Sequence, residues 1–513
     1  MHIANTVVQL VARVKCDEAV PACKRCSRHR KSCYYVNGLN QNKPQGPIEV
    51  VAHIAREIDH WSKIPSHERR GLWHFQARTI DQLKGPFGSE LWSNILPRMV
   101  WDDSVVRQSV LALSAFHEHY LDNKSPGAPP PDHVLAIYRK AVAQIATIPA
   151  PDNHLESILC ACVIFSACEG LTGNFEESVR HAVAGMKIIA AQKRTAPSRD
   201  LVLGNAKGVL PNVFMELQAQ VLEANIASFE IIDPAPDEQL EVPDRFENVE
   251  QAMACLHQLA SRFLQLFQQA ETYHEVYDWI PSQVATPLQP EHEAVCAAFS
   301  AWENAVSRSF SSTTSNQHAA YPLLEAQRHL FHVNQYVYVH GESRYDDLIH
   351  KIWMALGLII AYLSPSTNST SHSQPHHTTA SSLSCSRPST FTSSPEIVPL
   401  LFEIATRTND KNLSRRAIQM LRECNRREGI WDSKIAAQLA EHIHELVQEG
   451  CTTAEKSLPG SRFLITHIQI LSEKRCLIRY GFKKIRQGCF DSFWFENIRP
   501  EEGEIQTRII NLS

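Results

Sequence analysis

The chain has 513 residues and a formal net charge of −5 at pH 7, and 43% of its residues are hydrophobic. Its length suggests roughly two to four domains with a sizeable core. It contains no uninterrupted apolar run of about eighteen residues and no secretory signal pattern, and most cysteines are scattered singly. We therefore expect an intracellular, soluble protein with no membrane contact and no disulfide framework.

The charge is unevenly distributed along the chain. Residues 11–35 carry seven Lys or Arg against only Asp17 and Glu18, which leaves the rest of the chain acidic. A small basic head on an acidic body fits a nucleic-acid contact confined to one end. A basic loop that is merely solvated would give the same pattern, so charge alone does not decide between them.

Four cysteines in the basic head have the spacing of metal ligands. Cys16, Cys23, Cys26 and Cys33 form a C-x6-C-x2-C-x6-C pattern. Two thiolates separated by two residues can bind one tetrahedral zinc from a single turn, and the outer cysteines can close the shell from short loops. One zinc held by these four, or with His29 replacing one of them, is the arrangement that the residues allow.

This segment resembles the fungal binuclear zinc cluster, the Zn2Cys6 DNA-binding module of fungal transcription factors. The four cysteines match the third to sixth of that family, and Pro21 lies in the loop where the family usually has a proline. The resemblance implies zinc as the cofactor and Cys16, Cys23, Cys26 and Cys33 as its ligands.

The resemblance also implies that DNA is contacted by the short basic stretch before the cluster, of which Arg13 and Lys15 remain. The first two cysteines of the family have no counterpart, because residues 6–13 contain no ligand. The first cysteine bridges both zincs in the family, so its absence removes a ligand from each site. Two explanations stay open: the chain has lost direct DNA binding, or a truncated gene prediction omits an upstream exon, which we favour.

The free energy gained by binding zinc is comparable to the free energy lost in ordering this segment. Ordering about twenty residues costs roughly 1–2 kcal/mol each, whereas a structural zinc returns roughly 10–16 kcal/mol. Two zinc ions would offset this cost, whereas a single zinc would barely offset it. The stretch 16–33 has almost no large apolar side chains, so we expect it to be weakly ordered.

After the cysteines, residues 36–69 predict a linker followed by a short helix. The stretch 37–47 is polar and contains glycine and proline, and apolar residues then recur at helical spacing over 48–61. This helix is too short to be a dimerising coiled coil.

Helical periodicity continues through 70–363 and again through 396–490. The predicted helices are 104–121, 155–168, 175–191, 215–229, 249–273, 290–307, 321–362, 413–424 and 433–447. The helix 155–168 is apolar nearly all round and should be a central buried helix, with Cys160, Cys162 and Cys168 as buried thiols.

Helix ends are marked by particular residues. Asp103 precedes the helix 104–121, Gly173 should separate an antiparallel pair, and Gly429 should end one helix before Asp432 or Ser433 caps the next.

Two further segments differ in composition from the helices. Residues 364–395 are dominated by Ser and Thr and predict a disordered insert. Near the C-terminus, β-branched residues and partial alternation predict a small hairpin through 464–470, 477–482 and 493–498, and residues 491–513 are assigned to a tail.

The helical body resembles the regulatory domain, or middle-homology domain, that accompanies fungal zinc-cluster regulators. The resemblance rests on the order of several short motifs, namely 74–79 with 83–92, 107–118, 173–175 with 180–181, and 415–418 with 428–432. It implies a nuclear protein that controls transcription, with promoter DNA and the transcription machinery as partners and a homodimer as a further possibility.

Enzyme chemistry finds no support in the residues. The sequence lacks a nucleophile elbow, a P-loop and a dinucleotide fingerprint, and the histidines of 117–119 and 442–444 lack the spacing of a zinc protease. We expect these histidines on helix surfaces. Arg415, Arg416, Arg426 and Arg427 are expected to pair with carboxylates instead of contacting DNA.

The sequence thus predicts a mainly α protein with a truncated zinc-cluster head over 11–35, a linker and short helix over 36–69, a large helical regulatory domain over 70–363 and 396–490 around the insert, and a small C-terminal β-hairpin. The resemblance implies a sequence-specific transcription factor of the RNA polymerase II type, of a family whose members often regulate a metabolic gene cluster. The alternative is a co-regulator or helical scaffold that does not bind DNA.

Overall fold

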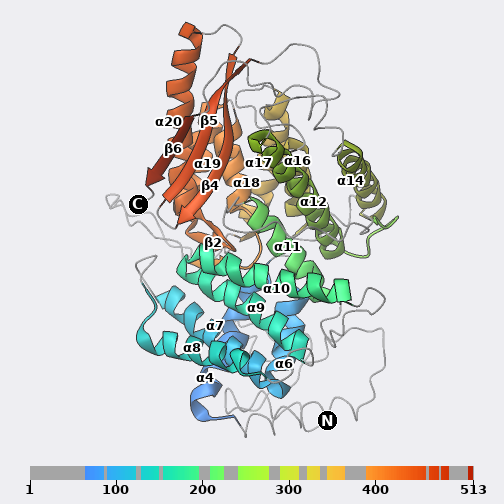
Figure 1. Cartoon of the computed structure of the whole chain (residues 1–513), viewed down its shortest axis with the longest axis vertical. Helices are drawn as coiled ribbons and strands as arrows, with labels where there is room; N and C mark the ends of the chain where they lie inside the picture. Colours follow the sequence, from blue (N-terminus) through green and yellow to red (C-terminus); the bar gives the residue numbers. More distant parts are fainter. Residues whose placement is uncertain are drawn as a thin grey trace, which may run out of the picture. The chain divides into compact units, whose positions relative to one another are not determined.

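Helices make up most of the described residues in the computed structural model (Figure 1). The structure describes residues 64–85, 89–122, 129–148, 154–195, 208–223, 241–276, 289–310, 320–334, 344–363, 389–408, 410–457, 461–472, 475–484 and 506–511. The chain divides into two units, Met1–Pro65 and Ser66–Ser513. The following description concerns the second unit.

The helices confirm the predicted mainly α fold. They are α4 (Ser66–His74), α5 (Ile80–Leu83), α6 (Leu96–Asp102), α7 (Ser104–Asp122), α8 (Asp132–Ala146), α9 (Leu155–Thr172), α10 (Phe175–Thr195), α11 (Val209–Glu223), α12 (Val249–Val276), α14 (Gln289–Ser309), α16 (Tyr321–Asn334), α17 (Arg344–Leu363), α18 (Val398–Arg407), α19 (Lys411–Cys424) and α20 (Ser433–Ser457). The π-helical turns Phe75–Thr79 and Leu91–Ile95 precede α5 and α6.

Most predicted helices begin and end within a few residues of the observed helices. Two predictions are less accurate, because α11 begins six residues before the helix predicted over 215–229 and α20 ends ten residues after the one predicted over 433–447. The single helix predicted over 321–362 is wrong, because the structure has two helices there, α16 and α17, which pack against each other. Helices α8 and α18 were not predicted individually. The short helix predicted over 48–61 lies outside the described residues.

Helix α9 is the buried centre of the N-terminal helices. Its side chains are apolar on every face, and it packs between α7 and α10, which run beside it (Figure 1). Among the described helices, α9 is the one that is long and apolar enough to cross a membrane, but 72% of it is buried inside the protein, as expected of a core helix. Its Cys160 and Cys168 thiols are buried, as predicted, whereas Cys162, for which burial was also predicted, is only partly buried.

Local capping fixes where these helices begin and end. Asp103 Oδ1 accepts hydrogen bonds from Val105 N at 2.7 Å and Val106 N at 3.0 Å, which satisfies free N–H groups at the start of α7. Gly173 ends α9 in the left-handed conformation (φ 82°), as the sequence predicts.

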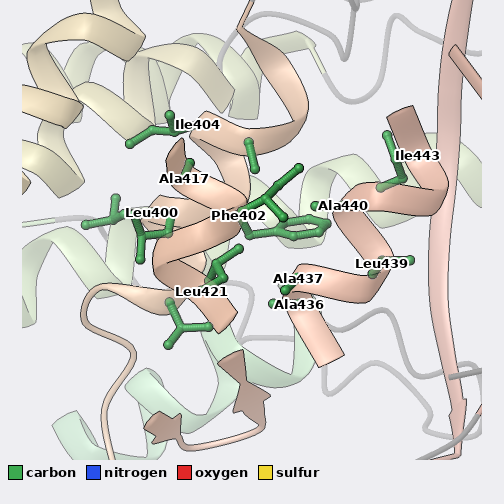
Figure 2. Close-up of a cluster of buried hydrophobic side chains, with 14 of the residues drawn as sticks. Leu400, Phe402, Ile404, Ala417, Leu421, Ala436, Ala437, Leu439, Ala440 and Ile443 are labelled. Carbon is green, nitrogen blue, oxygen red and sulfur yellow. The ribbon is translucent and has the colours of Figure 1, made fainter. Parts of the chain in front are cut away.

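The C-terminal helices share a separate hydrophobic core. Figure 2 shows apolar side chains of α18, α19 and α20 facing one another, with Phe402 between Leu421 and the alanines of α20. Helix α17 contributes Ile352 and Leu356 to the same core. Because every third or fourth residue of these helices is apolar, each buries one face.

A further core lies among α12, α14 and α16. Trp302 is fully buried there and donates from its indole Nε1 to Ala252 O at 2.8 Å. Its ring stacks on Phe299, whose ring in turn stacks on Phe331 of α16. The polar end of the tryptophan is therefore satisfied, and its apolar body holds the three helices together.

Two small three-stranded sheets complete the fold. One has the order β1 (Thr390–Thr392), β2 (Arg426–Glu428), β3 (Trp431–Asp432), with β1 parallel to β2. Strand β1 lies within residues 364–395, the range that composition assigns to the insert. It forms there because Phe391 is fully buried and its backbone pairs with that of Arg427. The prediction that the disordered insert extends to residue 395 was therefore wrong for residues 390–392.

The second sheet confirms two strands of the predicted C-terminal hairpin. It consists of β4 (Ser461–Ser472), β5 (Arg475–Lys484) and β6 (Gln506–Asn511), all antiparallel. The strand predicted over 493–498 lies outside the described residues. The third strand of the sheet is β6, within the range assigned to the tail.

Truncation of Leu356 to Ala tests the C-terminal core. Leu356 is fully buried, so removing its side chain should leave a cavity and lower the free energy of unfolding by about 2–5 kcal/mol. The measurement is urea unfolding of the full chain followed by tryptophan fluorescence.

The matched control on the same helix is Met354→Ala, because the Met354 side chain is 67% exposed. This variant should change the free energy by less than about 0.5 kcal/mol. Equal effects of the two substitutions would contradict the orientation of α17.

Candidate functional site

The residues predicted to hold zinc and contact DNA all lie outside the described residues. These are Cys16, Cys23, Cys26, Cys33, Arg13 and Lys15. Their chemistry suits zinc, since four thiolates match a tetrahedral structural site. Across the residues that the structure describes, no group of three or more His, Cys, Asp or Glu could hold a metal ion.

In the helical body, residues 70–363 and 396–490, several buried charged side chains meet at residues 425–433, which we call the junction. It contains β2, a turn and β3, and it connects α19 to α20. Helix α19 ends at Asn425, which adopts the left-handed conformation, and Gly429 (φ 57°) lies in the turn. The prediction that Gly429 ends a helix was therefore wrong, because Asn425 does so and the intervening residues pair as strands.

Arg427 connects the junction to two helices. Its side chain is buried; Nε donates to Asp432 Oδ2 at 2.7 Å and Nη1 donates to Leu171 O at 2.8 Å, at the end of α9. Asp432 Oδ1 accepts from Lys434 N and Ile435 N and so caps α20, as predicted. One ion pair thus ties the end of α9 to the start of α20.

A second buried ion cluster lies beside it. Glu428 is fully buried; its Oε2 accepts from Glu396 N at 2.7 Å and Val398 N at 2.9 Å, and its Oε1 accepts from Arg426 Nε at 2.8 Å. Arg426 Nη2 also donates to Glu396 Oε2 at 2.6 Å. Burial raises the pKa of Glu396, and Arg426 opposes that rise. Glu428 therefore anchors the start of α18 to the junction.

The four arginines expected to pair with carboxylates divide into two groups. Arg426 and Arg427 do pair with carboxylates, which confirms the prediction for them. Arg415 instead donates to Lys411 O and to the Asn412 amide. Arg416 lies over the ring of Trp353, 5.1 Å from its centroid. For Arg415 and Arg416 the expectation was wrong, because both lie on the exposed face of α19.

His117 also departs from expectation, because it is fully buried and not on a helix surface. Its Nδ1 lies 3.0 Å from Thr79 Oγ1 and its Nε2 lies 3.2 Å from Gln82 Oε1, and Gln82 Oε1 also accepts from Phe391 N. Burial, with a smaller contribution from His74, lowers the pKa of His117 to about 3. A neutral imidazole therefore links α7 to β1 as a structural group.

His444 is also a structural group. It is half-buried, and its Nε2 contacts Ala405 O at 2.7 Å and Ser414 Oγ at 2.5 Å. Ser414 is almost fully buried, so the pair is not exposed to a substrate. Neither His117 nor His444 indicates catalysis.

A pocket lined in part by the junction lies among α9, α10 and α11 and has a volume of about 500 Å³, including its opening to solvent. We call it the α11 pocket. Its walls are mainly apolar, and Phe391, Gly429 and Ile430 bring β1 and the junction into its lining. Sequence reasoning missed this pocket because its residues come from five separate segments.

Two side chains of α11 give the α11 pocket its polar character. Glu216 Oε1 and Gln220 Oε1 are buried and have no hydrogen-bond partner among the described residues. Burial raises the pKa of Glu216 to about 7, and a hydrogen bond with Ser394 opposes the rise. A carboxyl in this setting is a common mark of a binding site.

Three curated proteins are similar to this chain. The aspercryptin biosynthesis cluster-specific transcription regulator atnN of Emericella nidulans is 24% identical, and the alignment covers 96% of this chain and 94% of that protein. The Zn(2)-C6 fungal-type transcription factor afumD of Aspergillus fumigatus is 26% identical over 31% of this chain and 44% of its own length. The transcription regulator lscL of Purpureocillium lilacinum is 25% identical over 39% and 52%.

No family model matches the chain, and no solved structure matches it significantly.

Replacement of Arg427 by Gln tests the ion pair of the junction. The substitution leaves Asp432 buried without its cation and Leu171 O without its donor, so the free energy of unfolding should fall by about 3–5 kcal/mol. Urea unfolding of the full chain measures the change.

Arg180→Gln is the matched control, because Arg180 forms exposed ion pairs with Glu176 and Glu177. It should cost no more than about 1 kcal/mol. A similarly small effect at Arg427 would mean that the junction does not depend on its ion pair.

Replacement of Glu216 by Gln tests the raised pKa. The folded-state pKa is about 7 and the ordinary value is 4.5. The folded protein therefore binds the proton more tightly, and its stability falls as pH rises between these values. The Gln variant lacks this loss, so above pH 7 it should be more stable than the native chain by up to about 3 kcal/mol, with little difference at about pH 4.

Thermal melts of both proteins across this pH range provide the measurement. The control is Glu176→Gln on the neighbouring helix α10, where the carboxylate is exposed and pairs with Arg180. The assignment would be contradicted if the Glu216 variant lost as much stability as the native chain when the pH rises from about 4 to above 7.

Proposed function

We propose that this chain, which belongs to the family of fungal zinc-cluster transcription regulators, binds promoter DNA in a sequence-specific manner through residues 11–35. The observation that carries the proposal is the four-cysteine pattern in a basic segment, at the N-terminal end of a chain whose relatives are named transcription regulators. One of these relatives is named a Zn(2)-C6 factor.

In this proposal the thiolates of Cys16, Cys23, Cys26 and Cys33 hold zinc. A bound zinc would supply folding free energy to a segment that has almost no apolar core. The cysteines fix the loop, and Lys15 with Arg13 then lies at the edge of the ordered segment. These two cations neutralise phosphates or reach a base edge in the major groove.

The second unit is the regulatory part. We assign 36–69 to a linker and short helix and the helical body, 70–363 with 396–490, to the recruitment of transcription machinery in the nucleus; a homodimer is compatible with this assignment. One relative is named as specific to a biosynthesis cluster, which supports control of a metabolic gene cluster here too. The relatives are regulators by name, so catalysis is not part of the proposal.

A specific observation favours a second candidate, a co-regulator that does not bind DNA. No cysteine precedes Cys16 in this sequence, and the two that open the family's cluster are missing. In that case the helical body acts through partner proteins, and the remaining cysteines hold zinc weakly.

Replacement of Cys23 and Cys26 by Ser separates these two functions. If residues 11–35 read DNA, the double variant of the full chain should lose zinc and lose sequence-specific binding, because a structural zinc cannot be held without two of its four thiolates. Zinc content is measured by atomic emission, and binding to a DNA site selected from a random pool is measured by electrophoretic mobility shift.

Cys296→Ser in α14 is the matched control for the loss of a thiol, since Cys296 lies far along the chain in the helical body. Lys15→Gln should weaken binding to all sequences and reduce the dependence of log K on log salt by about one unit. Selective DNA binding that survives in the double cysteine variant would move the DNA contact elsewhere. Failure of the native chain to select any DNA site would favour the co-regulator.

A further inference from the structure

With Glu216 ionised, the α11 pocket offers acceptors and no free side-chain donor among the described residues that line it. Glu216 Oε1 and Gln220 Oε1 lack partners there. Gln220 Nε2 already donates to Ser393 O at 3.1 Å. The Ser178 hydroxyl donates to Ser166 O at 2.8 Å, and the Ser166 and Ser178 hydroxyls bond to each other at 3.0 Å. A molecule that completes this pocket must therefore bring donors.

The Ser393 hydroxyl is committed as well, because it donates to Leu83 O at 3.1 Å and accepts from Trp92 Nε1 at 2.9 Å. Among the side-chain atoms of the described lining, Glu216 Oε1 and Gln220 Oε1 are thus the buried acceptors without a partner. Glu216 and Gln220 lie four residues apart, so both side chains leave the helix on the same side. The two acceptors face one region of the pocket.

Apolar side chains surround these acceptors. The walls include Val163, Val179, Ala182, Val213, Leu217 and Phe391. The volume of about 500 Å³ includes the opening to solvent, so the enclosed part is smaller, and a slender group suits it better than a bulky one. A few polar groups in an apolar lining is the usual composition of a small-molecule site.

We propose that the α11 pocket binds a small molecule with an unbranched apolar body and a primary ammonium group, which donates hydrogen bonds to Glu216 Oε1 and Gln220 Oε1. An ammonium has three donors and no acceptor, and its charge complements a carboxylate. Once ionised, Glu216 repels an anion, and an alcohol brings a single donor for two buried acceptors. Leaving a buried acceptor unpaired costs free energy, so the pocket distinguishes these groups.

Such a ligand also contacts the junction. Gly429 and Ile430 line the pocket, and Gly429 N donates to Thr392 O at 2.8 Å. A bound molecule therefore touches α11, β1 and the turn between β2 and β3 at once. The site lies in the helical body and goes beyond the proposed DNA contact, on which it does not depend.

The test uses three probes of equal chain length with the full-length protein, namely n-hexylamine, 1-hexanol and hexanoate. Isothermal titration calorimetry should give a Kd for n-hexylamine on the order of 1 mM, because the probe has few atoms. The alcohol and the carboxylate should bind at least about tenfold more weakly, since neither pairs both acceptors. Glu216→Gln should weaken n-hexylamine at least about tenfold.

Glu176→Gln, an exposed position on α10, should leave the Kd for n-hexylamine unchanged. A thermal melt of the Glu216 variant without probe establishes that it is folded, and the comparison of the three probes on the native chain needs no variant. Equal binding of the probes, an undiminished affinity in the folded Glu216 variant, or no saturable binding of n-hexylamine at about ten times the expected Kd would each overturn the proposal. Because DNA is absent from the assay, its outcome is independent of the DNA-binding proposal.

Discussion

The ion pair between Arg427 and Asp432 joins parts of the helical body that are far apart in sequence. The guanidinium reaches Leu171 O at the end of α9, and the second oxygen of Asp432 caps the first turn of α20. A buried ion pair is favourable only when its remaining hydrogen-bonding groups are satisfied, and here both partners have further bonds. The pair therefore anchors the end of α9 to the start of α20.

The backbone around this pair is constrained by the same contacts. A Cβ at Gly173 would lie 3.2 Å from Arg427 Nη2, and a Cβ at Gly429 would lie 1.9 Å from Gln220 Oε1. Both glycines have a positive φ, so a side chain would be strained at either position. The close approach of Gly429 to α11 also brings the junction into the lining of the α11 pocket, so the shape of the pocket follows from the geometry of the junction.

What the sequence could predict depended on the range of the interactions involved. Helix α9 was predictable because its apolar residues are consecutive, and Gly173 and Asp432 were predictable because helix caps are local. The bond from Arg427 to Leu171 spans 256 residues, and no local pattern indicates such a partner. His117 was misplaced for the same reason, because the groups that satisfy a buried imidazole come from another helix. The zinc ligands remain a prediction from spacing and chemistry.

The arginines of this chain fall into two groups with different roles, which the net charge does not distinguish. Arg426 and Arg427 are neutralised inside the body by Glu396, Glu428 and Asp432, so they are unavailable to a polyanion. The segment 11–35 has seven cations and only two acidic residues. Affinity for DNA falls with every phosphate contact that is lost, so this excess of cations suits the proposed DNA contact better than a body of acidic balance does. Within the body, Arg426 and Arg427 are held in internal ion pairs whereas Arg415 and Arg416 stay exposed on α19, so the net charge does not tell which cations are available to a partner.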